Sequence, residues 1–222
     1  MVTDTIKTYS RKRHAVADAD TRSSGYWGKR VFDLTISLFI IVFVLSWLMP
    51  IIGLAVILSS PGPALFVQIR SGRNGRQFHC YKFRTMFIAP RHNHPFRQAS
   101  PDDPRVTPLG RLLRRTNLDE IPQFLNVLLG NMSLVGPRPH PIELDAQYWY
   151  KLPGYARRYD LKPGITGLAQ VRGYRGAVMN PLMMKHRVRY DRFYIQKASP
   201  LLDVSICLQT LAAMFTGNTD AF

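Results

Sequence analysis

Cysteine is scarce in this sequence of 222 residues, which contains only two. Cys80 and Cys207 lie far apart and show neither a metal-binding spacing nor the pattern of a disulfide framework. A disulfide-stabilised secreted scaffold and a cysteine-rich zinc module are therefore excluded, and a reducing compartment is expected. Among the six histidines, His92 and His94 form a close pair, but no further ligands accompany them, so both are interpreted as loop residues.

Acidic residues are also few, with 14 against 30 lysines and arginines and a formal net charge of +16. Such an excess calls for an anionic partner, which could be nucleic acid, anionic lipid or a phosphorylated substrate. Nucleic acid is disfavoured because aromatic and basic residues are not interleaved as in a nucleic-acid module. The remaining alternatives are an enzyme acting on a phosphate-bearing substrate and a non-enzymatic basic adaptor that binds anionic membrane lipid.

Only one long run lacks charge, residues 34–58, and its 25 residues are enough to cross a bilayer. Pro50 falls inside this run and predicts a kink near Met49. Basic residues flank the run on both sides, and such residues are retained on the cytoplasmic face of a membrane. A re-entrant helix that bends at the proline and returns to the same face satisfies both flanks. A kinked spanning helix is the alternative, which charge alone does not exclude.

The chain is expected to contain a disordered basic tail (1–25), a re-entrant membrane helix (26–60) and a cytoplasmic domain (61–222). The predicted fold class is α+β, mostly helical with one β-hairpin. Residues 64–69 and 77–83 have strand character, and Asn74-Gly75 between them favours a tight turn. Helices are predicted over residues 142–159, with a break at Pro153-Gly154, and over residues 183–196 and 201–215. A homo-oligomer formed through the last helix is compatible with the sequence but not required by it.

Positive charge is concentrated between Arg70 and Arg115, where 11 basic residues stand against two acids. Lys82 and Arg84 belong to this group and lie on the second strand of the predicted hairpin. They could face the membrane surface or bind phosphate groups, and the sequence allows both. The positive electrostatic potential of this basic region suits a site that attracts a phosphate ester.

Two adjacent acids, Asp119 and Glu120, follow this basic region. Thr116 and Asn117 each stand three residues before one of the acids, a spacing that resembles a capping box and predicts a helix start. The helix would extend through the apolar run to a stop at Gly130. The acids would then lie at the positive end of the helix dipole beside Arg114, which keeps them ionised.

Such a pair of acids can divide the labour of phosphoryl transfer. One carboxylate can attack phosphorus as a nucleophile, and the other can hold Mg²⁺, which prefers one or two carboxylates together with substrate phosphates. Arginines neutralise charge on the transferred group. First-turn acids of an ordinary helix are the alternative, and the neighbouring motifs weigh against it.

The motifs, in chain order, are SPGP (60–63), RNG (73–75), YKFRTM (81–86), DDPRVT (102–107), LDE (118–120), GPRP (136–139) and KPGITG (162–167). Their order over residues 26–215 resembles the bacterial sugar transferase family, the monotopic polyprenyl-phosphate phosphoglycosyl transferases. That resemblance implies transfer of a sugar phosphate from a UDP-sugar to undecaprenyl phosphate with release of UMP. It also implies Mg²⁺, an inner-membrane location with the catalytic domain on the cytoplasmic face, and a re-entrant helix broken at Pro50.

The resemblance further implies roles for individual residues. Asp119 would be the catalytic nucleophile, and Glu120 a catalytic residue and Mg²⁺ ligand. The implied substrate-binding residues are Arg114, Arg138, Pro137, Pro139, Lys82 and Arg84, with the Pro-Arg-Pro loop near the uridine.

The VGPRPH and QVRGYRG segments, at 135–140 and 170–176, are most similar to members that transfer glucose-1-phosphate in exopolysaccharide synthesis. Those relatives usually continue with Glu-Thr, where this chain has Ala177-Val178. Galactose and an N-acetylated hexosamine therefore stay open as alternatives to glucose.

Overall fold

The computed structural model describes residues 26–88, 96–100 and 102–215. The predicted basic tail (1–25) and the pair His92 and His94 lie outside these residues. The helical elements are α2 (Lys29–Ile40), η1 (Ile41–Leu45), α3 (Ser46–Ser59), η2 (Arg73–Gly75), α4 (Pro108–Arg115), η3 (Leu118–Glu120), α5 (Gln123–Leu128), α6 (Ile142–Tyr148), η4 (Tyr155–Tyr159), α7 (Leu168–Val171), α8 (Pro181–Lys197) and α9 (Pro200–Phe215). The strands are β1 (Leu65–Ser71), β2 (Gln77–Phe83), β3 (Ser133–Val135) and β4 (Gly164–Thr166).

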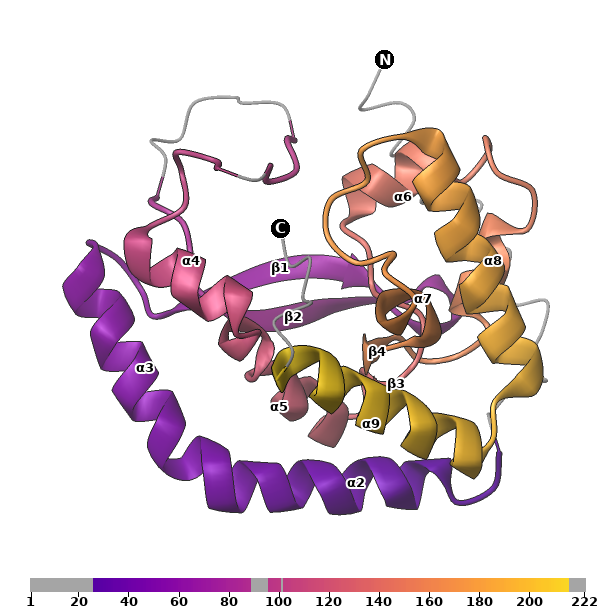
Figure 1. Cartoon of the computed structure of the whole chain (residues 1–222), viewed down its shortest axis with the longest axis horizontal. Helices are drawn as coiled ribbons and strands as arrows, with labels where there is room; N and C mark the ends of the chain where they lie inside the picture. The colour runs from indigo at the N-terminus through magenta and orange to yellow at the C-terminus, as the bar shows by residue number, and fades with distance from the viewer. Residues whose placement is uncertain (1–25, 89–95, 101, 216–222) are drawn as a thin grey trace.

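The apolar run forms one bent helix in which α2 leads through η1 into α3 (Figure 1). Together these elements cover Lys29–Ser59, which is long and apolar enough to cross a membrane by length and composition. Pro50 lies within α3, so the helix continues past the proline. The wider π-helical turn of η1 comes just before α3, so two recognised causes of helix bending adjoin each other.

Side chains donate hydrogen bonds to backbone carbonyls in the bend. Ser46 Oγ donates to the carbonyl of Val42 at 2.6 Å, and Trp47 Nε1 donates to that of Phe43 at 2.8 Å. These donors lie one helical turn beyond their acceptors, where the π turn displaces the regular backbone hydrogen bonds and the N–H of Ser46 bonds the carbonyl of Ile41. The bend is therefore built into the local sequence.

The predicted β-hairpin is confirmed. β1 and β2 pair antiparallel, with Leu65 opposite Phe83 and Ser71 opposite Gln77. Asn74 and Gly75 both adopt positive φ, at 54° and 69°, as a tight turn requires. One face of β2 places Phe78 and Cys80 in a small core beneath α5. The hairpin thereby fixes the position of Lys82 relative to the segment that carries the two acids.

A second, parallel sheet joins the two glycine-containing loops. Ser133 of β3 pairs with Gly164 of β4, and Val135 pairs with Thr166. A Cβ atom on Gly164 would lie 2.1 Å from the backbone nitrogen of Gly136, so neither backbone leaves room for a side chain. The glycines of the predicted loop at 162–167 serve this close approach, and the loop itself contains a short strand.

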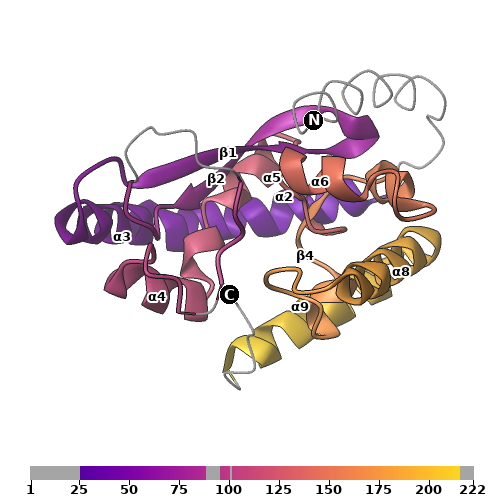
Figure 2. The same ribbon diagram turned by 90° about the horizontal axis from the view of Figure 1, so that it is seen from above.

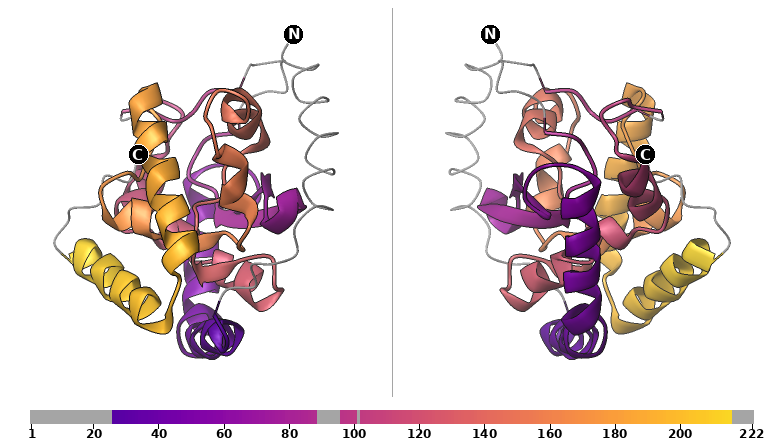
Figure 3. Two further views of the ribbon diagram at one scale, coloured as in Figure 1. Left: turned by 90° about the vertical axis from the view of Figure 1, so that its right-hand side faces the viewer. Right: turned by 90° about the vertical axis from the view of Figure 1, so that its left-hand side faces the viewer.

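Helices α6, α8 and α9 enclose the remaining core. The structure confirms the predicted interruption of residues 142–159, because α6 ends at Tyr148 and η4 begins at Tyr155. Helix α8 starts two residues earlier than predicted, where Asn180 Oδ1 accepts from the backbone of Met183 at 2.8 Å. Seen from above, the β1–β2 hairpin lies on one side and α8 and α9 on the other (Figure 2). The side views show α9 near the start of α2 (Figure 3).

The start of α2 is fixed to the rest of the fold by polar contacts. Lys29 Nζ lies 2.5 Å from Asp203 Oδ2 on α9, and Asp33 Oδ1 accepts from the backbone of Leu134 at 3.0 Å. Arg30 donates to the carbonyl of Val127 at 2.7 Å, at the end of α5. Because Lys29 and Asp33 are buried, α2 begins as part of the folded domain and continues as an apolar helix.

Candidate active site

The segment around the two acids is not one helix, so the capping-box prediction is wrong. Thr116 ends α4, and its hydroxyl donates back to the carbonyl of Leu112 at 2.9 Å. Asn117 adopts a left-handed conformation with φ 60° and forms no side-chain cap. Asp119 and Glu120 then fall in the short 3₁₀ turn η3, and α5 begins after Pro122. Both acids are buried in this turn.

Helix α4, which leads into this turn, has its own start signal. Thr107 Oγ1 accepts from the backbone N–H of Gly110 at 2.9 Å, and Pro108 occupies the first helical position. A Cβ atom on Gly110 would lie 2.1 Å from the carbonyl oxygen of Thr85, so the helix packs directly on the chain leaving β2. This contact sets the distance between η3 and the hairpin.

Glu120 is surrounded by cationic side chains from three other segments. Lys82 Nζ on β2 lies 2.5 Å from Oε1, and Arg138 donates to both carboxylate oxygens at 2.5 and 3.1 Å. Arg175 Nη2 lies 3.7 Å from Oε2. Burial alone would raise the pKa of Glu120, but Arg138 and Lys82 outweigh it and hold the pKa well below its usual range. Glu120 is therefore ionised and anchors the surrounding cations.

Asp119 has a different environment although it adjoins Glu120. Asp119 is only 8% exposed. Among the residues that the structure describes, none lies close enough to form a hydrogen bond or an ion pair with its carboxylate. Burial raises the pKa of Asp119, while the charge of Lys82 opposes that rise. An uncommitted carboxylate with raised basicity, within a cationic environment, is what nucleophilic attack on a phosphate group requires.

The loop that carries Arg138 is held in place by hydrogen bonds that other residues donate to its backbone carbonyls. Arg158 Nη2 donates to the carbonyl of Arg138 at 2.8 Å, and Arg70 Nη1 donates to that of Pro139 at 2.6 Å. The carbonyl of Pro137 accepts from the backbone N–H of Gly164 at 3.0 Å. Three successive residues of this Gly-Pro-Arg-Pro loop are thus fixed, and the guanidinium of Arg138 is directed onto Glu120.

A buried polar cluster lies behind this loop. His140 is 2% exposed, and its Nδ1 accepts a hydrogen bond from Arg158 Nη1 at 2.8 Å and lies 2.7 Å from the hydroxyl of Tyr155. Arg158 in turn pairs with Asp191 at 2.7 Å. Burial, followed by the charge of Arg158, holds the pKa of His140 well below its usual range, so the imidazole is neutral at physiological pH. The cluster supports the position of the loop.

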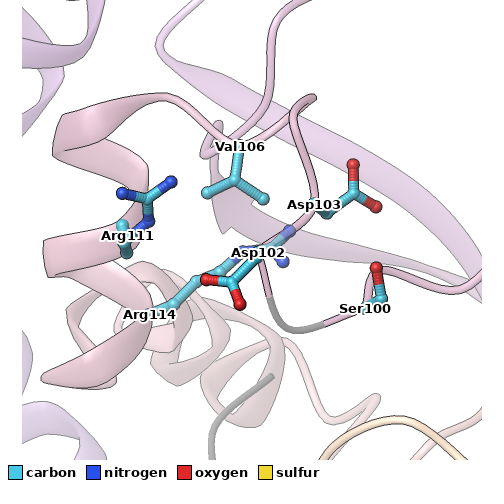
Figure 4. Close-up of a pocket in the computed structure, with 6 residues that line it drawn as sticks. All are labelled: Ser100, Asp102, Asp103, Val106, Arg111 and Arg114. Atoms are coloured by element: carbon cyan, nitrogen blue, oxygen red, sulfur yellow. The ribbon is translucent and has the colours of Figure 1, made fainter.

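Arg114 lies on the other side of the acids, at the end of α4. Its Nε donates to Thr85 Oγ1 at 2.9 Å. Burial lowers the pKa of Arg114, and the carboxylate of Asp119 is the strongest charge opposing that shift. Figure 4 shows Arg114 at the edge of a small pocket beside α4. The residues that line this pocket are Ser100, Asp102, Asp103, Val106, Arg111 and Arg114.

Arg84 is not brought to the two acids. It is 5% exposed and makes five hydrogen bonds, among them one from Nη1 to Ser60 Oγ at 2.5 Å and one from Nε to the carbonyl of Pro63 at 2.7 Å. The acceptors all lie in the last turn of α3 and the SPGP segment after it. Arg84 therefore ties the hairpin to the end of the apolar helix, and its predicted part in substrate binding stays a prediction.

Replacing Arg84 by methionine is expected to destabilise the fold rather than weaken substrate binding. The buried carbonyls at the end of α3 would lose a charged donor, and a loss of about 3 kcal/mol corresponds to a melting temperature lower by roughly 6–12 °C. Arg76→Met in the exposed hairpin turn is the matched control. A raised KM for the substrate at an unchanged melting temperature would instead support the substrate-binding prediction.

Several residues of the site were not found by sequence reasoning. Arg175 carried no assigned role, although it stands in the QVRGYRG segment that contributed to the family resemblance. The sequence identifies Arg70 only as part of the basic region, and it assigns no role to Arg158, His140 or Asp191. Their partners are far away in sequence, so no local spacing could have indicated the cluster.

The acids offer a minimal donor set for a metal ion. No group of three or more histidine, cysteine or acidic side chains suited to a metal occurs among the residues that the structure describes. Mg²⁺ commonly uses one or two carboxylates and completes its shell with water and substrate phosphates, and Asp119 supplies such a carboxylate. Glu120 fits as a second ligand only if one of its cationic partners moves away.

The sequence comparisons agree with the motif resemblance. Residues 24–217 match the family model described as bacterial sugar transferase. A protein named UDP-glucose:undecaprenyl-phosphate glucose-1-phosphate transferase from Caulobacter vibrioides is 45% identical over 189 residues, which cover 85% of this chain and 70% of that protein. Its namesake from Escherichia coli is 44% identical over 190 residues, which cover 86% of this chain and 40% of that protein.

A third relative is similar in length to this chain. The exopolysaccharide production protein PSS of Rhizobium leguminosarum bv. phaseoli is 41% identical over 191 residues, which cover 85% of this chain and 95% of that protein. The chain thus spans less than half of the Escherichia coli relative but nearly all of the Rhizobium one. Because the family model matches almost the whole described fold, including both acids and the loop of Arg138, the chain belongs to the bacterial sugar transferase family.

Proposed function

We propose that this chain transfers a sugar 1-phosphate from a UDP-sugar to undecaprenyl phosphate, with release of UMP. The observation that carries the proposal is the uncommitted carboxylate of Asp119 next to a glutamate that anchors several cations. The names of the relatives from Caulobacter and Escherichia coli support glucose 1-phosphate as the transferred group. The name of the Rhizobium relative supports a place in exopolysaccharide synthesis.

The reaction would proceed in two displacements at one phosphorus atom. A carboxylate oxygen of Asp119 attacks the sugar-bearing phosphorus of the UDP-sugar, and the bond from that phosphorus to the bridging oxygen breaks. UMP leaves with the bridging oxygen and the electron pair, and the sugar phosphate is left bound to Asp119 as an acyl phosphate. A phosphate oxygen of the lipid then attacks the same phosphorus, which frees the Asp119 carboxylate and forms the lipid-linked diphosphosugar.

The cations would stabilise charge during both displacements. Lys82 and Arg138 stand beside the carboxylates in a buried environment, where electrostatic attraction to a diphosphate is strong. Arg114 approaches from α4 and Arg138 from the Pro137–Pro139 loop, which we place near the nucleotide. Mg²⁺, held by Asp119 and, after exchange of a partner, by Glu120, would neutralise further charge on the diphosphate.

We further propose that residues 26–60 form a re-entrant membrane helix and that the catalytic domain, residues 61–222, stands on the cytoplasmic face of the inner membrane. Polar contacts hold Arg30 near the start of the helix and Ser60 at its end to the same folded domain. Between these points the outer side of the helix carries apolar side chains that are at least half exposed. They are Leu38, Phe39, Val42, Phe43, Trp47, Ile51, Leu54, Ile57 and Leu58.

This arrangement supports a helix that dips into one leaflet and returns. An exposed apolar surface of this extent needs a lipid or protein partner. Arg76, exposed in the hairpin turn beyond the helix, is available to anionic lipid headgroups. A straight spanning helix would carry one of its two fixed ends to the opposite side of the bilayer.

Single cysteines on either side of the helix test this topology. Trp27 and Gln77 are exposed, and they precede and follow the helix. Cys80 is fully buried, so the substitution Cys207→Ser gives a background without a reactive cysteine in the described part of the chain. In this background we expect Trp27→Cys and Gln77→Cys both to react with an impermeant maleimide in inside-out vesicles. Neither should react in right-side-out vesicles before detergent is added. Labelling of the two positions from opposite sides would mean that the helix spans the bilayer.

Release of UMP tests the proposed reaction. Purified protein with Mg²⁺, undecaprenyl phosphate and UDP-glucose is expected to release UMP, and omission of the lipid should prevent multiple turnovers. UDP-galactose, UDP-N-acetylglucosamine and UDP-N-acetylgalactosamine identify the preferred donor when offered in parallel. Binding of anionic vesicles that is lost at high salt, without UMP release from any donor, would favour the basic adaptor instead.

A further inference from the structure

The loop between α7 and α8 brings an additional arginine to the carboxylate pair. Arg175 stands between Gly173 and Gly176, which both adopt positive φ, at 84° and 61°. Its side chain is 14% exposed, and Nη2 lies 3.7 Å from Glu120 Oε2, too far for a hydrogen bond. Within the described part of the chain, its guanidinium donates no hydrogen bond, whereas Lys82 and Arg138 both donate to Glu120.

A second arginine holds the backbone of this loop. Arg187 on α8 is 2% exposed, and its Nε donates to the carbonyl of Tyr174 at 3.0 Å. Its Nη2 donates to the carbonyls of Arg175 and Gly176 at 2.8 and 3.1 Å. No acidic side chain of the described residues lies within ion-pair distance of Arg187. A buried guanidinium is costly without partners, and here three successive carbonyls of one loop satisfy it.

The same cluster supports both arginine-bearing loops. Arg187 Nη1 lies 3.3 Å from Nε2 of His140, and Arg158 Nη1 lies 2.8 Å from Nδ1 of that ring. Arg158 holds the carbonyl of Arg138, while Arg187 holds that of Arg175. One buried imidazole therefore connects the two supports. The fold fixes Arg138 and Arg175 relative to each other and to Glu120.

We propose that Arg175 binds the diphosphate of the nucleotide-sugar donor, and that Arg187 is a positioning residue that acts through Arg175. This inference rests on the proposed function and names two further residues of its site. The donors of Arg175 are free to bond non-bridging phosphate oxygens, and its planar fork suits bidentate contact. Lys82 and Arg138 stay paired with Glu120 and keep it ionised, while Arg175 leaves Glu120 and binds the substrate phosphates.

Donor affinity of Arg175→Ala tests the first part. Titration calorimetry with UDP and Mg²⁺ gives Kd, and UMP release from UDP-glucose gives KM. Loss of a charged hydrogen bond should raise both by about 10- to 100-fold. Arg172→Ala, which removes an exposed arginine three positions earlier, should change neither by more than about 2-fold. Equal effects of the two variants would overturn the assignment, because they would reflect net charge alone.

A double-mutant cycle tests the second part. Arg187→Lys keeps the charge but cannot serve three carbonyls, so it should raise KM by about 10-fold. In the Arg175→Ala background the same change should have almost no further effect on KM. Arg189→Lys, on an exposed position of α8, is the matched control. Additive effects of Arg175→Ala and Arg187→Lys would show that Arg187 does not act through Arg175.

The measurements distinguish this inference from the proposed function. If wild-type protein binds UDP and releases UMP while Arg175→Ala retains wild-type Kd and KM, only the role of Arg175 fails. If folded wild-type protein binds neither UDP nor any UDP-sugar, the proposed function fails and the assignment of Arg175 fails with it.

Discussion

Replacing Asp119 by asparagine should abolish sugar-phosphate transfer while leaving the fold intact. An amide cannot form the acyl phosphate, and loss of a catalytic nucleophile typically reduces kcat by about 10⁴-fold or more. Burial raises the pKa of Asp119, which means that the fold disfavours the ionised form. At pH 7 the neutral amide should therefore leave the melting temperature unchanged or raise it. UMP release and a thermal melt of the same preparation measure both effects.

Glu143→Gln, an exposed change on α6, is the control for this pair of measurements. It should retain wild-type turnover and stability. Substantial turnover by Asp119→Asn would contradict the nucleophile assignment. A large fall in its melting temperature would contradict the environment described for this carboxylate.

Glu120→Gln should affect stability in the opposite direction. The structure holds the pKa of Glu120 well below its usual range through Arg138 and Lys82, so the ionised form is favoured. Breaking a buried ion pair costs about 3–5 kcal/mol, which predicts a melting temperature lower by roughly 6–20 °C at pH 7. Because Lys82, Arg138 and Arg175 all lose their shared anchor, turnover should fall at least about 100-fold.

The pH dependence of this loss has a definite sign. A carboxylate with a depressed pKa contributes stability above its unfolded pKa, and that contribution disappears as the pH falls toward the folded pKa. The gap in melting temperature between wild type and Glu120→Gln should thus be full above about pH 5 and narrow at lower pH. A constant gap across this range would show that Glu120 does not stabilise the fold as an ion-pair anchor.

The proposed Mg²⁺ role of Glu120 is tested on the same variant. We expect the residual activity of Glu120→Gln to need a higher Mg²⁺ concentration for half-maximal rate, because one carboxylate ligand is lost. An unchanged Mg²⁺ titration would remove Glu120 from the ligand set. Asp119 would then be the carboxylate that binds the metal ion.

The sequence predicted the local parts of this fold well. The hairpin around Asn74-Gly75 follows from turn chemistry, and the interruption at Pro153-Gly154 follows from residues that cannot continue a helix. The region of the two acids was predicted less well. Its spacing suggested a capping box, but Asn117 adopts a left-handed conformation, which asparagine tolerates better than most other residues, so the same residues suit either structure.

The partners of the buried charges could not be read from the sequence. Arg84 appeared to be one of many basic residues of the hairpin, yet it binds carbonyls at the end of α3. Arg175 and Arg187 appeared unremarkable, although one contacts the carboxylate pair and the other holds its loop. Such contacts join residues that are far apart along the chain, and periodicity and spacing carry information only about near neighbours.

Intact-mass spectrometry of wild-type protein, incubated with Mg²⁺ and UDP-glucose in the absence of lipid, shows directly whether Asp119 receives the sugar phosphate. We expect a mass increase of one hexose phosphate, which is absent in Asp119→Asn and disappears when undecaprenyl phosphate is added. If folded wild-type protein that releases UMP never carries the adduct, or if Asp119→Asn carries it as well, Asp119 is not the nucleophile that receives the sugar phosphate.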